Sequence, residues 1–183
     1  WSGFFRVLAY RNQAAMGNYD LANRAQGIPD ITSTRSPYRT KYGYGLNAEL
    51  SYSDVLGLFA RYGWSDGKNE TWAFTEIDES ISVGVHFWGK SWNRKQDFAG
   101  IAWVTNGLSS SHQKYQQLGG NGFMIGDGKL NYGLENILEA FYSFQVPHSP
   151  FTLSPDFQWV INPGYNIDRG PLTVWGLRVH TEL

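Results

Sequence analysis

The chain has 183 residues, 42% of them hydrophobic and 16% aromatic, with 8 Trp, 21 Gly and a mean hydropathy of -0.40. Its formal net charge is -1 and it holds no cysteine, which excludes disulfides, thiolate metal sites, cysteine nucleophiles and a global field that would attract nucleic acid. A chain that is rich in rings yet polar on average interleaves polar and apolar residues finely, and its many aromatic and β-branched residues favour strands over helices.

Period-2 alternation between turn signals predicts an all-β fold of about eight strands. They are expected near residues 3–11, 42–53, 55–65, 71–87, 97–106, 136–146, 150–162 and 171–183. No apolar run approaches the roughly 18 residues that a membrane-spanning helix needs, whereas the strands of a membrane barrel are shorter and alternate.

The predicted connections alternate in length along the chain. Short turns are expected near residues 53–54, 88–96 and 147–150, and longer excursions at 12–41, 66–70, 107–135 and 163–170. Outer-membrane barrels have this asymmetry, with short periplasmic turns and longer extracellular loops. The opening residues WSGFFRVLAY read as strand interior without a signal peptide, so we expect the chain to be part of a longer protein.

Alternation within the strands gives each one a polar and an apolar side. In the segment LEAFYSFQV, Leu138, Ala140, Tyr142, Phe144 and Val146 share one side, opposite Glu139, Phe141, Ser143 and Gln145. The last strand sets Arg178, His180 and Glu182 opposite Trp175, Leu177, Val179, Thr181 and Leu183. Ionisable residues on one side indicate that water reaches that side.

This pattern fits a membrane barrel and also a soluble or surface-attached carbohydrate-binding β-sandwich, whose apolar faces pack on each other. Predicted strands of ten to twelve residues favour the barrel, because soluble strands are usually nearer five or six. Aromatic residues at strand ends favour it too, since they are typical of girdles at lipid boundaries. The girdle candidates are Tyr44, Tyr52, Trp64, Trp72, Phe87, Trp88, Trp159 and Trp175.

No catalytic constellation stands out. The four histidines are scattered without metal-site spacing, and no cofactor motif is present. Glu76 and Asp78 could be read as paired glycosidase carboxylates, but residues two apart on a strand lie about 7 Å apart on one side with no positioning shell. We therefore expect neither an enzyme nor a metal site.

Nine charged residues are placed on the polar side by alternation. As the lining of an aqueous lumen, such charges would hydrogen-bond sugar hydroxyls while aromatic rings support the C–H faces. Surface charges or lumen salt bridges that only hold the wall together are the alternative for each residue. The nine are Arg6, Lys41, Glu49, Arg61, Glu76, Asp78, Glu139, Asp156 and Arg178.

Several segments resemble one known family. TKYGYGLNAEL, GDGKLNYG, EAFYSFQ and NPGYNIDRGP, with the stretches around them, are similar to the C-terminal half of carbohydrate-selective porins of the OprB type. The resemblance implies a bacterial outer-membrane protein with a 16-stranded antiparallel barrel, of which this chain would supply half, and inward-folded loops that form a narrow sugar-selective eyelet. Family members usually end in Phe, whereas this chain ends in Leu183.

The matching segments also carry candidate eyelet residues. They are Arg35, Arg39, Lys41, Arg61, Glu76 and Asp78. We expect residues 1–183 to be the C-terminal part of a single barrel domain that lets mono- or oligosaccharides diffuse passively. Its expected partners are neutral sugars and outer-membrane lipid. A second copy of the chain is a further candidate partner. A third interpretation is that the barrel wall docks another envelope protein or a polysaccharide export complex.

Overall fold

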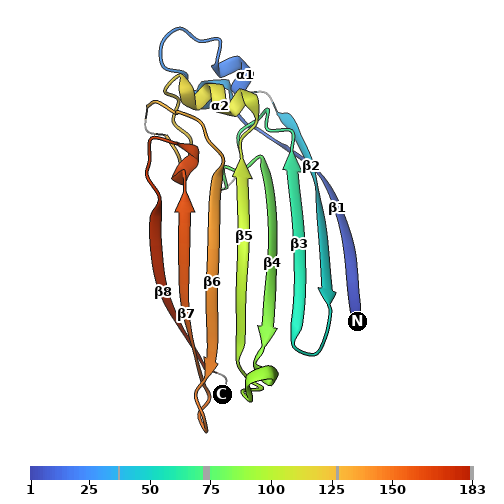
Figure 1. Ribbon diagram of the computed structural model, residues 1–183. Coiled ribbons are helices and arrows are strands. Elements are labelled where there is room, and N and C mark those ends of the chain that lie inside the picture. The colour runs from blue at the N-terminus through green and yellow to red at the C-terminus, as the bar shows by residue number, and fades with distance from the viewer. Residues whose placement is uncertain (37, 72–74, 127, 182–183) are drawn as a thin grey trace.

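The computed structural model describes residues 1–36, 38–71, 75–126 and 128–181, in which eight strands form one antiparallel sheet in chain order (Figure 1). The strands are β1 (Ser2–Ala14), β2 (Arg39–Ser51), β3 (Leu56–Ser65), β4 (Glu79–Trp88), β5 (Phe98–Gly107), β6 (Glu135–Gln145), β7 (Phe151–Ile161) and β8 (Leu172–Thr181). The helices are α1 (Tyr19–Ala22) and α2 (Ser110–Gln117), and the 3-10 turns are η1 (Ile31–Thr34), η2 (Gly89–Trp92) and η3 (Pro163–Tyr165). Among the described residues, none of these helices is long and apolar enough to cross a membrane.

The predicted asymmetry of the connections is confirmed. Residues 52–55, 89–97 and 146–150 make the connections at one end of the sheet, which we call the short-turn end. Residues 15–38, 66–78, 108–134 and 162–171 connect the strands at the opposite, long-loop end, and the described residues among them gather above the sheet (Figure 1).

Seven strands lie within a few residues of their predicted positions, and the fourth does not. It was expected from residue 71, but β4 begins at Glu79; residues 72–74 lie outside the described part of the chain, and 75–78 belong to the connection. The prediction that Glu76 and Asp78 lie in a strand and alternate with its neighbouring residues is therefore wrong. Both side chains are buried, because they make hydrogen bonds inside the long loops.

The register defines two faces of the sheet, since residues directly opposite each other on antiparallel strands point to the same side. Glu139 pairs with Ala102 and Gln158, and this side is the polar face. Leu138 pairs with Trp103 and Trp159, and this side is the apolar face. The predicted alternation along the sixth and eighth strands is confirmed for the described residues.

Most of the buried hydrophobic side chains among the described residues lie in the connections, while Val160 is buried within β7. Tyr19, Ala22, Ile31 and Tyr115 form one cluster, and Leu108, Leu130 and Tyr165 form a second. The described strands all belong to one sheet, whose apolar face stays open, with Leu177 68% exposed and Val179 59% exposed. A sandwich needs a second sheet on that face, so the sandwich interpretation is not favoured.

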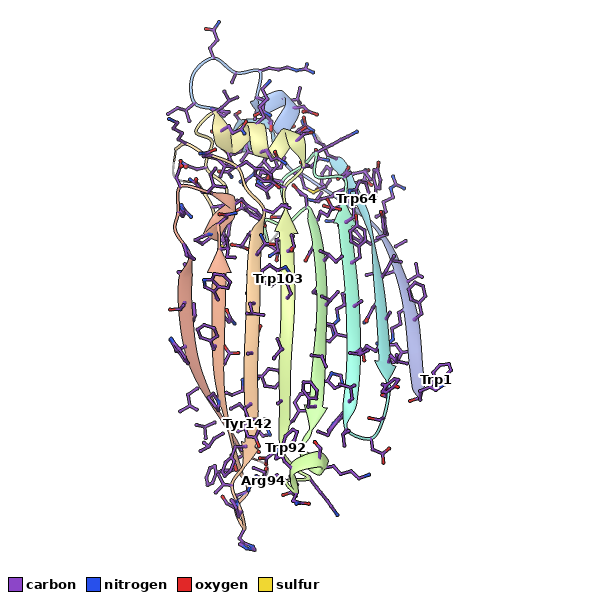
Figure 2. All side chains as sticks on the ribbon, viewed as in Figure 1. Trp1, Trp64, Trp92, Arg94, Trp103 and Tyr142 are labelled. Carbon is purple, nitrogen blue, oxygen red and sulfur yellow. The ribbon has the colours of Figure 1, made fainter. Side chains whose placement is uncertain are left out.

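Two of the predicted girdle residues, Tyr44 and Trp64, meet on the apolar face near the long-loop end, 5.3 Å between ring centroids. Trp92 and Tyr142, which were not predicted as girdle residues, lie near the short-turn end (Figure 2). Trp88 was assigned to this girdle wrongly: it pairs with Phe98 and so points to the polar face. Trp72 lies outside the described residues.

Candidate functional site: the polar face and the loop cap

The register brings the charged residues of the polar face into successive cross-strand rows. One row contains Arg6 and Arg61, joined through Asn47 of β2. The next row contains Glu49 and Glu139, joined through residues of β3, β4 and β5.

Asp156 and Arg178 belong to the rows nearer the short-turn end. Asp156 pairs with Phe141, and Arg178 pairs with Ser154. Ser154 in turn donates a hydrogen bond to Ser143 at 3.0 Å, which continues this last row from β7 to β6.

Three of the predicted lining residues share one groove. It has a volume of about 560 Å³ and contains Glu139, Asp156 and Arg178 together with serine, glutamine and phenylalanine side chains. The groove has two carboxylates and one guanidinium, so a neutral polyhydroxy molecule would find both hydrogen-bond acceptors and donors there. The remaining lining residues are Phe98, Phe141, Ser143, Ser154, Gln158, Gly176 and Leu177.

Arg61 lies beside a neighbouring groove. Its guanidinium is 3.6 Å from Glu49 and lies over the ring of Phe59, 5.0 Å from the centroid. Glu139 and the ring of Phe141 line both grooves, so the two grooves meet at β6.

The connections at the long-loop end together form what we call the loop cap. The other predicted residues lie in these connections or against them. Lys41 projects from the polar face of β2 and is only 6% exposed. Its ammonium donates to the carbonyl oxygen of Asn69 at 3.2 Å and lies 3.6 Å from Asp78. The cap is thereby anchored to the polar side of the sheet.

Asp78 is the charged centre of the cap. Its Oδ2 accepts the backbone N–H of Ser109 at 2.9 Å and lies 3.0 Å from Nδ1 of His112. Burial alone would raise the pKa of Asp78, but the hydrogen bond and charge of His112, the charge of Lys41 and the Ser109 N–H outweigh it and hold the pKa below its ordinary value.

Glu76 binds a later part of the connection 108–134. Its carboxylate accepts the backbone N–H groups of Phe123, Met124 and Ile125 at 3.0, 2.7 and 2.7 Å. A Cβ at Gly122 would lie 1.7 Å from Glu76 Oε1, so only glycine lets the loop approach this closely. Glu76 therefore holds the loop backbone together instead of lining the polar face.

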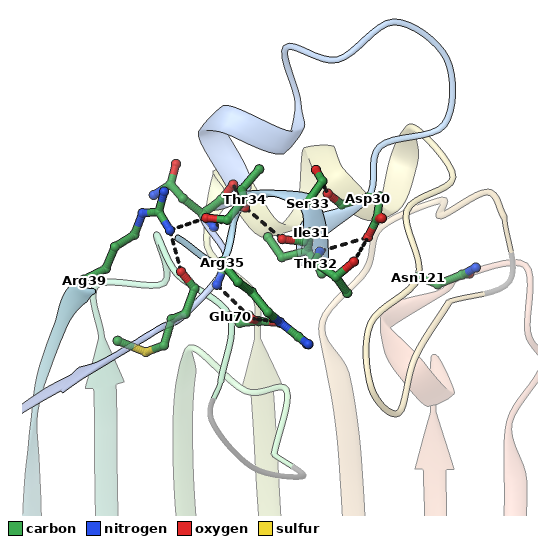
Figure 3. A network of polar contacts seen from close by, with 12 residues as sticks. Asp30, Ile31, Thr32, Ser33, Thr34, Arg35, Arg39, Glu70 and Asn121 are labelled. Carbon is green, nitrogen blue, oxygen red and sulfur yellow. Dashed lines mark hydrogen bonds and ion pairs between the residues drawn. The ribbon is translucent and has the colours of Figure 1, made fainter. Parts of the chain in front are cut away.

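Arg35 and Arg39 also bind within the cap (Figure 3). Arg35 makes a bidentate ion pair with the carboxylate of Glu70, with N–O distances of 2.7 and 3.1 Å. Glu70 also accepts a hydrogen bond from the backbone N–H of Gly17 at 2.7 Å. Arg39 donates to the carbonyl oxygens of Met16 and Thr34. The structure therefore brings Arg61, Glu139, Asp156 and Arg178 to the polar face, and uses Arg35, Arg39, Lys41, Glu76 and Asp78 in the cap.

Sequence reasoning missed the contribution of α2. Ser109 caps its N-terminus by accepting the N–H of His112, and the imidazole of His112 stacks on Tyr19 with centroids 4.2 Å apart. Ser109 at the N-cap position, followed by the helix formers Gln113, Lys114, Gln116 and Gln117, is the signal that could have predicted this helix. Its packing against Tyr19 joins residues too far apart in sequence for any local pattern to reveal.

A polar clamp fixes the short-turn end. Asp97 is 1% exposed and accepts hydrogen bonds from Arg94 at 2.6 and 3.1 Å, from Tyr142 at 2.5 Å and from the N–H of Gln145 at 3.1 Å. Trp92 donates to Tyr142 at 3.0 Å, and Figure 2 shows Trp92, Arg94 and Tyr142 together there. The connection 89–97 is thereby tied to β6.

In the part of the chain that the structure describes, no group of three or more His, Cys, Asp and Glu side chains is arranged to hold a metal ion. The polar face instead offers hydrogen-bonding groups, opposite charges and ring faces along one wall. Such a surface is suited to weak contacts with a polar solute that moves past it.

Comparisons with known proteins agree with this arrangement. The chain is 26% identical over 142 residues to Porin AaxA of Chlamydia pneumoniae, a match that covers 77% of this chain and 28% of that protein. It superposes on Pseudomonas putida OprB, in a structure at high pH, with a TM-score of 0.74 and 20% identity, over 98% of this chain and 44% of that one. The chain thus spans less than half the length of either relative.

The model of the carbohydrate-selective porin family, OprB, matches residues 2–183. The single open sheet with one polar and one apolar face fits a wall of such a barrel, as does the superposition on a solved porin. The chain therefore belongs to the OprB family of carbohydrate-selective porins, and it is a transmembrane β-barrel protein of the bacterial outer membrane.

Proposed function

We propose that the polar face lines a water-filled lumen through which mono- or oligosaccharides diffuse passively, without enzymatic chemistry. The observation that carries this proposal is the groove holding Glu139, Asp156 and Arg178 beside aromatic rings, on the face opposite the apolar one. Sugar hydroxyls can replace their hydrogen bonds to water by hydrogen bonds to these side chains, and the net change in free energy is small.

Residues 1–183 would then be the C-terminal half of a single 16-stranded barrel domain. In lipid, each unpaired N–H or C=O along the edges at β1 and β8 would cost several kcal/mol. Pairing with further strands would remove this cost and close the lumen. The apolar face would contact lipid, with the loop cap on the outer side.

Liposome swelling with the full-length, purified porin tests the proposal. Vesicles that contain the inserted protein should swell in isotonic glucose faster than empty vesicles, and more slowly as the sugar becomes larger. A folded, inserted protein that passes ions but no sugar would contradict it.

A further inference from the structure

Aromatic rings form a continuous row on the polar face. His86 and Trp88 meet edge to face with centroids 4.5 Å apart, and Phe98 lies 5.4 and 5.9 Å from these two rings. Phe141 follows at 5.5 Å from Phe98. We call His86, Trp88, Phe98 and Phe141 the aromatic track; it crosses from β4 through β5 to β6.

Glycines on the neighbouring strands let two of these rings lie against the wall. Gly100 faces the polar side opposite Phe141, and a Cβ there would lie 2.6 Å from a carbon of the Phe141 ring. Gly57 stands in the same relation to His86, where a Cβ would lie 2.0 Å from the imidazole. Since a Cβ on this side points out of the sheet, each ring covers its glycine and turns its other face to the lumen.

Hydrogen-bonding groups flank the track on both sides. The groove of Glu139, Asp156 and Arg178 includes Phe98 and Phe141 in its lining. The groove of Glu49 and Arg61 includes the same two rings and His86. Flat rings between opposite charges match a ring-shaped solute that is apolar on its faces and polar around its rim.

We propose that the aromatic track is a binding site for pyranose rings, which stack their C–H faces on Phe98 and Phe141. The sugar hydroxyls bond to Glu139, Asp156 and Arg178. The inference rests on the proposed function and narrows its substrate class to cyclic sugars with a continuous C–H face, as in glucose and its oligomers. An acyclic polyol such as sorbitol has matching hydroxyls but no such face, so it gains little from the track.

The test uses full-length porin in planar bilayers and liposomes. Maltotriose should block the ion current reversibly, and Phe98→Ala with Phe141→Ala should raise the half-blocking concentration about tenfold, as expected when some 50 Å² of apolar contact is lost. Phe141→Leu, which keeps an apolar side chain without a ring, should raise it by a smaller factor. Phe141→Tyr should stay close to wild type.

Two further variants sharpen the test. Gly100→Ala pushes the Phe141 ring off the wall without removing it, and should weaken the block. Phe157→Leu changes a ring on the apolar face, where Phe157 lies against Trp175 with centroids 4.7 Å apart, and should leave the block unchanged. Unaltered heat-modifiable mobility on a gel identifies the variants that fold. If the variant with both Phe98→Ala and Phe141→Ala does not insert, the block measured with Phe141→Leu and with Gly100→Ala tests the proposal.

The outcomes separate the two proposals. Wild-type porin should pass glucose faster than sorbitol, and the track variants should reduce that ratio toward one. Folded track variants could instead pass sugar with an unchanged ratio of glucose flux to sorbitol flux and an unchanged block by maltotriose. That result would overturn the proposal of the aromatic track but not the proposal of a sugar pore. Absence of all sugar flux through an ion-conducting wild-type protein overturns both.

Discussion

Asp78 binds two other parts of the molecule through one carboxylate: β2 through Lys41, and the N-terminus of α2 through Ser109 and His112. A carboxyl group whose pKa is lowered by folding contributes stability that is present above its unfolded value and lost as the pH falls through the folded value. Since the pKa of Asp78 lies below the ordinary range, the loop cap should stay closed in mild acid and loosen only below about pH 4.

Protease protection of the loop 108–134 in liposomes, followed against pH, measures this. Asp78→Asn should expose the loop at neutral pH and remove most of the acid dependence. Release of the wild-type loop already at about pH 6 would show that another group controls the cap.

Glu76 holds another part of the same connection, residues 123–125, so its removal should loosen the backbone mainly there. Glu76→Ala leaves the N–H groups of Phe123, Met124 and Ile125 without their acceptor, which should cost about 3 kcal/mol or more because each is a bond to a charged group. Hydrogen exchange at these three amides should become faster by a large factor. Glu76→Gln keeps one acceptor oxygen and should lose less; equal exchange in all three proteins would contradict this role.

At the scale of the elements, the connection 89–97 depends on Asp97, which is buried and accepts from Arg94, Tyr142 and Gln145. Asp97→Ala leaves these donors without their common acceptor, so the barrel should lose its heat-resistant gel mobility at a clearly lower temperature. Lys90→Ala is the matched control: it breaks the exposed pair between Lys90 and Asp54 in the same region and should change little. Equal effects would show that the clamp is no more important than a surface pair.

The strands were predictable because their signal is local. Alternation from Leu138 to Gln145 indicates both faces of β6, although Phe141 places an apolar ring on the polar face. The start of β4 was not predictable, since Glu76 and Asp78 continue the alternating pattern into a loop where long-range hydrogen bonds decide the backbone path. Helix α2 was missed because its packing on Tyr19 and its contact with Asp78 join distant segments.

Within the candidate site, too, the residues placed by local alternation were predictable and those placed by long-range contacts were not. The positions of Glu139, Asp156 and Arg178 follow from strand alternation, and pairing then gathers them into one groove. Arg35 and Arg39 are placed by the way the loops fold onto each other, and no periodicity encodes that arrangement.

In the whole molecule, the buried apolar clusters lie in the loop cap, and the polar face of the sheet is open. The charges on the polar face should therefore control which ions pass through the pore. Arg178 lies in the groove with Asp156 and Glu139, and Arg178→Glu replaces its positive charge with a negative one. The reversal potential of the full-length porin under a salt gradient should shift toward cation selectivity, and less so in high salt because of screening. An unchanged reversal potential would place Arg178 away from the ion path.

The central claim is that the polar face is the sugar path and the apolar face is not. The chain has no cysteine of its own, so Ser143→Cys on the polar face and Ala140→Cys on the apolar face place one thiol each on β6. Glucose uptake into liposomes is measured before and after a bulky, membrane-impermeant thiol reagent. Our account predicts that the reagent labels the Ser143→Cys protein and sharply reduces its uptake, while the Ala140→Cys protein stays unlabelled and active. Labelling of the Ala140→Cys protein, or full uptake through the labelled Ser143→Cys protein, would contradict it.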